Sequence, residues 1–104
     1  EASYFAGAAD IAYRRLGRIY EQEGSDEKAE IYLQRSLQIN PYRMENLSSY
    51  RSFHKTESAG SFCNRILSLY SSDKDNLEFL RQWADKENEI DIFLYFDDFI
   101  MIVV

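Results

Sequence analysis

The chain has 104 residues, of which 45% are hydrophobic and sixteen are aromatic, and it carries a net charge of −6. This composition fits a single packed domain over residues 1–104 and favours a packed globule over a disordered segment. One cysteine excludes both an intrachain disulfide framework and a multi-cysteine zinc site, and it fits a reducing compartment, cytoplasmic or nuclear. Because the chain does not begin with Met, we expect a fragment or a processed product.

The acidic excess lies entirely in the last third of the chain. Residues 1–72 hold nine acids and nine bases, whereas residues 73–104 hold nine acids and three bases. Because nucleic-acid binders need a positive face, this balance argues against a nucleic-acid partner and favours proteins. No apolar run approaches the roughly 20 residues of a membrane span, and the N-terminus lacks the basic region of a secretory signal. We therefore predict no membrane partner and an intracellular location.

Three helices are predicted in the first half of the chain. Apolar residues recur at helical spacing over residues 11–23, and Gly24 is placed to end that helix. Ser25 can cap a second helix, which should end at Asn40-Pro41 because proline pushes the preceding residue out of the α region. Proline is tolerated in the first turn of a helix, so a third helix is predicted from Tyr42 to about Lys55.

The second half predicts two further helices and a tail. A helix is expected over residues 59–69, a polar loop with capping residues over 71–76, and another helix over 77–84. The tail, LYFDDFIMIVV, admits two interpretations, an apolar helix or a β-prone end. As a helix it would continue the stack through Ile90, Phe93, Leu94, Met101 and Val104. The whole pattern predicts an all-α chain of antiparallel helix pairs joined by short loops.

Residues 10–43 carry eight residues at the spacings of a known helical repeat. Counting Asp10 as position 1, an aromatic stands at positions 4 and 11, small residues at 8, 20 and 27, and proline at 32. The segment resembles a tetratricopeptide repeat (TPR), a helix–turn–helix unit of about 34 residues. The small residues suit a close crossing of two helices. The matching residues are Tyr13, Leu16, Gly17, Tyr20, Ala29, Leu33, Ser36 and Pro41.

The rest of the chain follows this repeat less closely. Residues 44–72 fit a degenerate TPR, in which Tyr50 and Arg51 replace the expected Leu-Gly pair, and residues 73–104 add a helix and the apolar, acidic tail. The resemblance implies a TPR-like right-handed solenoid with a short stack. Since a solenoid unit cannot bury both faces alone, such a stack is expected to self-associate or to pack on a partner.

The resemblance also implies a binding surface. TPR stacks bind partners on the concave face formed by the first helix of each pair. Arg14 and Arg18 lie one turn apart there and suit an acidic or C-terminal peptide, although a solvated basic stripe is the alternative interpretation. The predicted partner-binding residues are Ile11, Arg14, Arg18, Glu21, Gln22, Glu45, Ser48, Ser52 and Lys55.

A more specific TPR function is disfavoured by the sequence. Co-chaperone TPRs that clamp a C-terminal carboxylate carry Lys and two Asn at positions that here hold Arg14, Arg18 and Ser49. An unrelated TPR adaptor or co-chaperone module that binds a peptide in its concave groove therefore remains an alternative rather than the first hypothesis.

Catalytic interpretations have little support, and no cofactor or metal is expected. His54 has no cysteine or acid at ligand or triad spacing in the sequence, which indicates a surface or groove residue, and Cys63 is predicted to be core. Asp97 and Asp98 resemble the Y-x-D-D hairpin of reverse transcriptases, where paired carboxylates hold two metal ions. A two-metal enzyme is therefore kept as a remote alternative to a non-enzymatic chain.

The closest resemblance concerns RLGRIYEQEGSDEKAEIYLQRSLQINPY and the following PYRMEN. A helix that ends in S-L-x-x-N-P before an aromatic is similar to the TPR scaffold subunits of the anaphase-promoting complex (cyclosome), and PYRMEN looks like a junction in one of them. This resemblance covers roughly residues 10–55. It implies a non-catalytic subunit of a ubiquitin ligase that acts in the cell cycle and associates through TPR surfaces.

Overall fold

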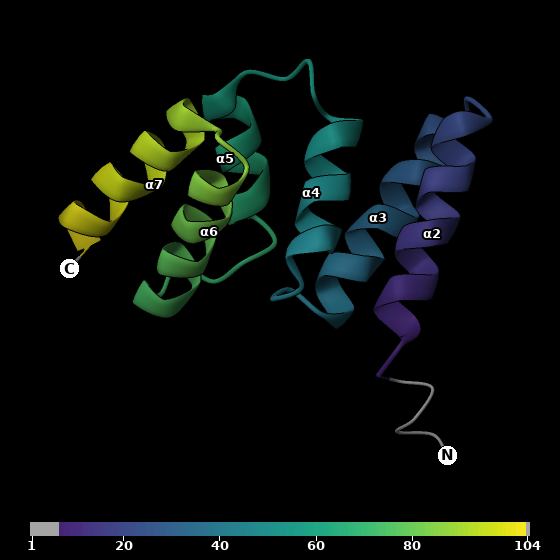
Figure 1. Ribbon diagram of the computed structural model, residues 1–104, viewed down its shortest axis with the longest axis horizontal. Coiled ribbons are helices and arrows are strands. Elements are labelled where there is room, and N and C mark those ends of the chain that lie inside the picture. The colour runs from purple at the N-terminus through teal and green to yellow at the C-terminus, as the bar shows by residue number, and fades with distance from the viewer. Residues whose placement is uncertain (1–6, 104) are drawn as a thin grey trace. The chain divides into compact units, whose positions relative to one another are not determined.

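The computed structural model describes the backbone of residues 7–103 and the side chains of residues 7–102, and every regular element in that range is an α-helix (Figure 1). The all-α class predicted from the sequence is therefore confirmed for this range. The helices are α2 (Ala9–Gln22), α3 (Asp26–Ile39), α4 (Met44–Phe53), α5 (Ala59–Leu67), α6 (Lys74–Lys86) and α7 (Ile90–Val103).

The chain divides into two compact units, Glu1–Lys55 and Thr56–Val104. The boundary falls inside residues 44–72, the segment that resembles a degenerate repeat. The first unit contains α2 to α4 and the second contains α5 to α7. The single domain expected over residues 1–104 stays a prediction, and each unit is described separately below.

Helices α2 and α3 form a hairpin whose turn is built around Gly24. Gly24 has a φ of 80°, a left-handed conformation that favours glycine. The Ser25 amide donates to the Tyr20 carbonyl over 2.9 Å and the Gly24 amide donates to the Glu21 carbonyl over 3.1 Å, which together form a Schellman motif. The helix stop predicted at Gly24 is confirmed. Ser25 stands at the N-cap position of α3 as expected, but its side chain makes no capping hydrogen bond.

The two helices of this hairpin cross closely at Gly17. Gly17 is buried, and a Cβ atom added to it would lie 2.7 Å from Cγ of Leu33 and 3.1 Å from the Leu33 backbone nitrogen. Only a residue without a side chain fits this spacing. Ala29 and Leu33 are both fully buried on α3. The close helix crossing predicted from the small residue Gly17 is thus confirmed.

The joint after α3 differs from the prediction. Asn40 is extended, with φ −138° and ψ 88°, as expected for a residue before proline. The Tyr42 amide then donates to the Asn40 side chain over 3.2 Å, and Arg43 is also extended. Because this turn occupies Pro41 to Arg43, α4 begins at Met44, and the prediction that the third helix begins at Tyr42 is wrong. Helix α4 packs on both α3 and α2.

In the second unit, side chains cap the first two helices. Ser58 accepts a hydrogen bond from the Ser61 amide at the start of α5, and Asp73 accepts one from the Asn76 amide at the start of α6. Helix α6 therefore begins at Lys74, so the second half of the segment predicted as a loop is helical. Asn88, with φ 57°, supplies the left-handed residue between α6 and α7, where the Glu89 amide donates to the Ala84 carbonyl over 2.9 Å.

Helix α7 packs on α5 and α6, and it settles the two interpretations of the tail in favour of a helix (Figure 1). The prediction of which face continues the stack is wrong, because Ile90, Leu94 and Met101 are exposed; of the predicted residues, Phe93 is half-buried. A different stripe, one turn apart at each step, is buried instead; its members are Ile92, Phe96 and Ile100. The predicted Val104 lies outside the described residues.

The core of the second unit is aromatic and aliphatic. The rings of Phe62 on α5 and Trp83 on α6 lie 6.2 Å apart, and both side chains are buried. Cys63 is also fully buried, which confirms its predicted place in the core. The remaining buried apolar residues of this unit are Ile66, Tyr70, Leu77, Leu80, Ala84, Ile92, Phe96 and Ile100.

Candidate functional site

The predicted partner-binding residues lie on two helices that contact one another, α2 and α4. We call this set the α2–α4 face. Its α2 members are Ile11, Arg14, Arg18, Glu21 and Gln22, and its α4 members are Glu45, Ser48 and Ser52, with Lys55 just after the helix. Gln22, Glu45, Ser52 and Lys55 are exposed, and the other members are half-buried.

Arg18 and Glu21 form an ion pair within this face. The Arg18 guanidinium lies 3.1 Å from Oε1 of Glu21, one helical turn away, and the two side chains are 41% and 29% exposed. An ion pair this accessible to water exchanges its partners at little cost. An acidic group of a binding partner would therefore compete with Glu21 for Arg18.

Arg14 has a different environment from Arg18, although both were predicted to receive a peptide. Nη1 of Arg14 donates a 3.0 Å hydrogen bond to Oδ1 of Asn46, which is fully buried on α4. Arg14 thereby links α2 to the joint that follows α3. The geometry gives Arg14 a structural contact that the sequence did not predict.

Asn46 is the centre of a buried polar network at the joint. Its Nδ2 donates to Oδ2 of Asp10 over 2.8 Å and lies 3.2 Å from the carbonyl oxygens of both Ser36 and Asn40. Arg43 also donates to Oδ2 of Asp10 through its Nε. The network thus ties the first turn of α2 to the end of α3 and the start of α4.

Asp10 is held ionised within this network. Only 1% of the residue is exposed, and burial alone would raise the pKa of its carboxyl. Hydrogen bonds from Asn46 and Arg43, together with the Arg43 charge, outweigh burial and leave the pKa of Asp10 below its ordinary value. Oδ1 of Asp10 is buried and has no hydrogen-bond partner in the part of the chain that the structure describes.

Of the residues that match TPR positions, half are buried inside the α2–α3 hairpin and half are half-buried at its surface. Tyr13 and Tyr20 on α2 both stack on Tyr32 of α3, with ring centroids 5.9 Å and 5.4 Å apart. The Arg35 guanidinium lies 5.9 Å from the Tyr32 ring. Ser36 is buried and donates to the Leu33 carbonyl, whereas Leu16 and Pro41 are half-buried. The sequence did not single out Tyr32 as the ring that joins the other two.

His54 lies beside an acid that the sequence spacing did not reveal. Its Nε2 is 2.6 Å from Oε1 of Glu30, and Glu30 also accepts from Gln34 and from the Tyr50 hydroxyl. Glu30 and His54 line a shallow hollow of about 570 Å³ with Phe53 and Ile31. This placement agrees with the groove residue expected at His54. Glu30 orients the imidazole of His54. Among the described residues that line the hollow, none is a serine or cysteine that could act as a nucleophile.

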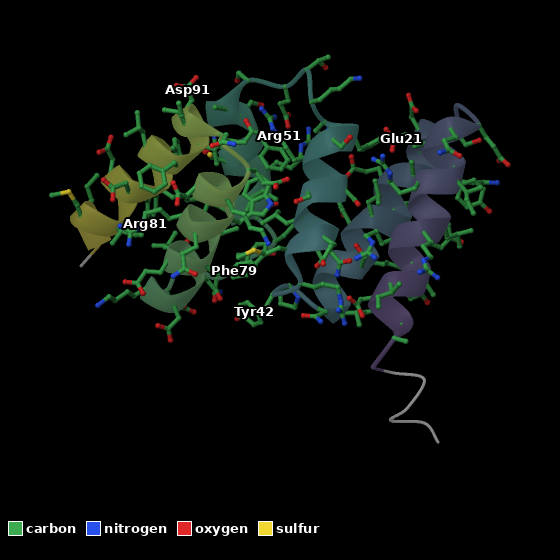
Figure 2. All side chains as sticks on the ribbon, viewed as in Figure 1. Glu21, Tyr42, Arg51, Phe79, Arg81 and Asp91 are labelled. Carbon is green, nitrogen blue, oxygen red and sulfur yellow. The ribbon has the colours of Figure 1, made fainter. Side chains whose placement is uncertain are left out.

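Asp97 and Asp98 lie on a helix rather than on a hairpin. Oδ1 of Asp97 lies 2.8 Å from Nη1 of Arg81 on α6, and Asp98 is exposed; Figure 2 shows Arg81 between the two helices. Across residues 7–103, no group of three or more His, Cys, Asp or Glu residues is arranged to hold a metal ion. The hairpin geometry on which the two-metal alternative depended is therefore not present.

Comparisons of the chain with protein-family models, curated proteins and solved structures found no match. Within the described residues, no helix combines the length and the apolar character needed to cross a membrane.

Proposed function

We propose that the chain is a TPR-like helical-repeat protein, a right-handed solenoid with a short stack, that works by binding other proteins and carries no catalytic chemistry. The observation that carries this proposal is the α2–α3 hairpin. Its helices cross at Gly17 against Leu33, and the following α4 packs on both of them. A third helix that contacts both members of a helix pair is how a stack of such pairs is extended.

Within that class, we propose a scaffold fragment of an anaphase-promoting-complex-like ubiquitin ligase. The support is the PYRMEN joint, which resembles a junction in those subunits. Arg43 and Asn46 of this joint bind Asp10, the first residue of the repeat. These residues therefore have a physical role that a generic helix pair would not require, since they tie the start of α4 to the first turn of α2.

The alternative is an unrelated TPR adaptor or co-chaperone module that takes a peptide on the α2–α4 face. Arg18 suits such a role, because its ion pair with Glu21 is exposed and exchangeable. Arg14 suits it less, because its guanidinium already bonds to buried Asn46. The two hypotheses predict different partners and are separated by identifying them.

The test is affinity capture of partners by the tagged chain, followed by mass spectrometry. We expect subunits of a multi-subunit ubiquitin ligase, and expect fewer of them with Asn46→Ala, which removes the centre of the joint. Arg18→Glu provides a matched surface change. Recovery of chaperones that depends on Arg18 would favour the adaptor alternative, and recovery of no ligase subunit would overturn the scaffold assignment.

The enzymatic alternative is tested directly. Metal-dependent nuclease or polymerase activity that Asp97→Ala abolishes would contradict a non-catalytic chain. Self-association, predicted from the short stack, is a separate proposal. Analytical ultracentrifugation that shows a monomer at micromolar concentration would remove it and leave the binding role intact.

A further inference from the structure

Helix α7 presents an exposed apolar row that its own unit does not cover. Ile90, Leu94 and Met101 are 70%, 50% and 77% exposed, and we call these three residues the α7 row. At about 100° per residue they lie within about 40° of one another, on the side of the helix opposite buried Phe96. The row extends roughly 17 Å along the helix, about three turns.

Acidic side chains border this row on both sides. Asp91 and Asp98 are exposed along one side, and Asp97, paired with Arg81, lies on the other. Helix α7 carries these three aspartates and no base. Figure 2 shows Asp91 at the start of α7. A partner that covers the row must therefore place positive charge beside apolar side chains.

The charge of the whole unit strengthens this requirement. Residues 56–104 contain ten acids and four bases, a net charge of −6, whereas residues 1–55 contain eight of each. Two of those four bases, Arg65 and Arg81, already pair with Glu57 and Asp97. The field around the α7 row thus attracts a cationic partner and repels an anionic one.

We propose that the α7 row binds an amphipathic helix with basic flanks, supplied by a partner protein. The row occupies positions i, i+4 and i+11 of α7, with Asp97 at i+7. An amphipathic helix with apolar residues at i, i+4 and i+11 matches the length of the row, and its Lys or Arg side chains reach Asp91 and Asp98. This surface lies on a different helix from the α2–α4 face. The proposal therefore does not depend on the TPR assignment.

A second copy of the same face is a poor occupant. Pairing two α7 rows would place the three aspartates beside one row near the three beside the other, and like charges brought together across an interface are destabilising. An anionic lipid surface is disfavoured for the same reason. Charge complementarity selects the basic helix.

The test uses the full chain and a designed peptide of about 18 residues, long enough to form a helix, with Leu on one face and Lys on the rest. A matched peptide carries Glu in place of Lys. By isothermal titration calorimetry at low salt, we expect the Lys peptide to bind at least about tenfold more tightly than the Glu peptide. Added NaCl should weaken this binding, since salt screens exposed charges.

Two pairs of variants locate the binding. Leu94→Glu should weaken binding of the Lys peptide by about tenfold or more, as expected for a central apolar contact, whereas Ile39→Glu, an equal change at a 45% exposed residue of α3, should not. Asp98→Lys should also weaken it, and Glu23→Lys should not. Circular dichroism confirms that each variant is folded.

Three results would overturn the proposal. The first is no measurable binding of the Lys peptide, and the second is equal affinity for the two peptides. The third is a dimer, seen by sedimentation, that Leu94→Glu dissociates, because that result would make a second copy the occupant of the row.

Discussion

Gly17 on α2 lies so close to Leu33 on α3 that a methyl group on Gly17 would meet the Leu33 Cγ atom at 2.7 Å. This distance is shorter than van der Waals contact, so the Leu33 side chain or one of the two helices would have to shift. This contact sets the spacing of the α2–α3 hairpin, on which the position of α4 and the polar joint depend.

The first prediction concerns Gly17→Ala. Overpacking of a close crossing costs about 1–3 kcal/mol, and the better helix propensity of alanine returns up to about 1 kcal/mol. We therefore expect a net loss of about 1–2 kcal/mol in the free energy of unfolding, measured by urea denaturation followed by circular dichroism.

Gly60→Ala is the matched control for that change. Gly60 is on α5, has no positive φ, and has no atom within 4 Å of an added Cβ. The same substitution there should stabilise the chain by up to about 1 kcal/mol.

A second control uses a Leu33→Ala background, in which Gly17→Ala should lose most of its cost in unfolding free energy. An equal cost in both backgrounds would contradict the contact.

The second prediction concerns the buried network at Asp10. Asp10→Ala leaves Arg43 and the Asn46 amide without a carboxylate partner, so we expect a loss of about 1–3 kcal/mol at neutral pH. Glu23→Ala, at an exposed position after α2, should change stability by no more than about 0.5 kcal/mol. Equal effects of the two changes would show that the network does not hold the joint.

The pH dependence of this effect is a third prediction. Because the pKa of Asp10 is below its ordinary value of 3.8 in the folded chain, the stability it contributes is present above pH 3.8 and is lost as the pH falls through the folded-state pKa. The difference in unfolding free energy between the wild type and Asp10→Ala should therefore shrink in acid. Urea denaturation at neutral pH and near pH 3 measures it, and a constant difference would contradict an ionised Asp10.

The fourth prediction separates Arg14 from Arg18. Arg14→Ala removes a hydrogen bond to buried Asn46 and should cost about 1 kcal/mol of stability, whereas Arg18→Ala removes an exposed ion pair and should cost about 0.5 kcal/mol or less. Thermal denaturation of both variants measures this. If Arg18→Ala is the more destabilising, the structural contact assigned to Arg14 is wrong.

The helix boundaries that the sequence predicted correctly are those fixed by local chemistry. Gly24 ends α2 because a left-handed residue closes its Schellman motif, and Asn40 ends α3 because a proline follows it. Each depends on neighbours within about five residues. The start of α4 was missed because the turn after Pro41 uses the Asn40 side chain and an extended Arg43.

The candidate site was less predictable because its contacts join distant residues. Asp10 meets Asn46 36 positions away, and His54 meets Glu30 24 positions away. Helix spacing cannot anticipate such pairs. The buried face of α7 was missed for another reason: IDIFLYFDDFIMIV is apolar on nearly every side, so its pattern does not decide between Ile92 and Leu94 as the inward residue.

The last prediction tests whether residues 1–104 behave as one domain. Trp83 is the chain's one tryptophan, lies in the second unit and is 1% exposed, so its fluorescence reports on that unit. Neighbouring units of a continuous solenoid unfold cooperatively. We therefore expect Gly17→Ala, a change in the first unit, to lower the urea midpoint of the Trp83 signal as much as that of circular dichroism. Leu80→Ala, within the second unit, is the positive control. If Gly17→Ala leaves the Trp83 transition unchanged while Leu80→Ala shifts it, the two units unfold independently and the single-domain prediction is wrong.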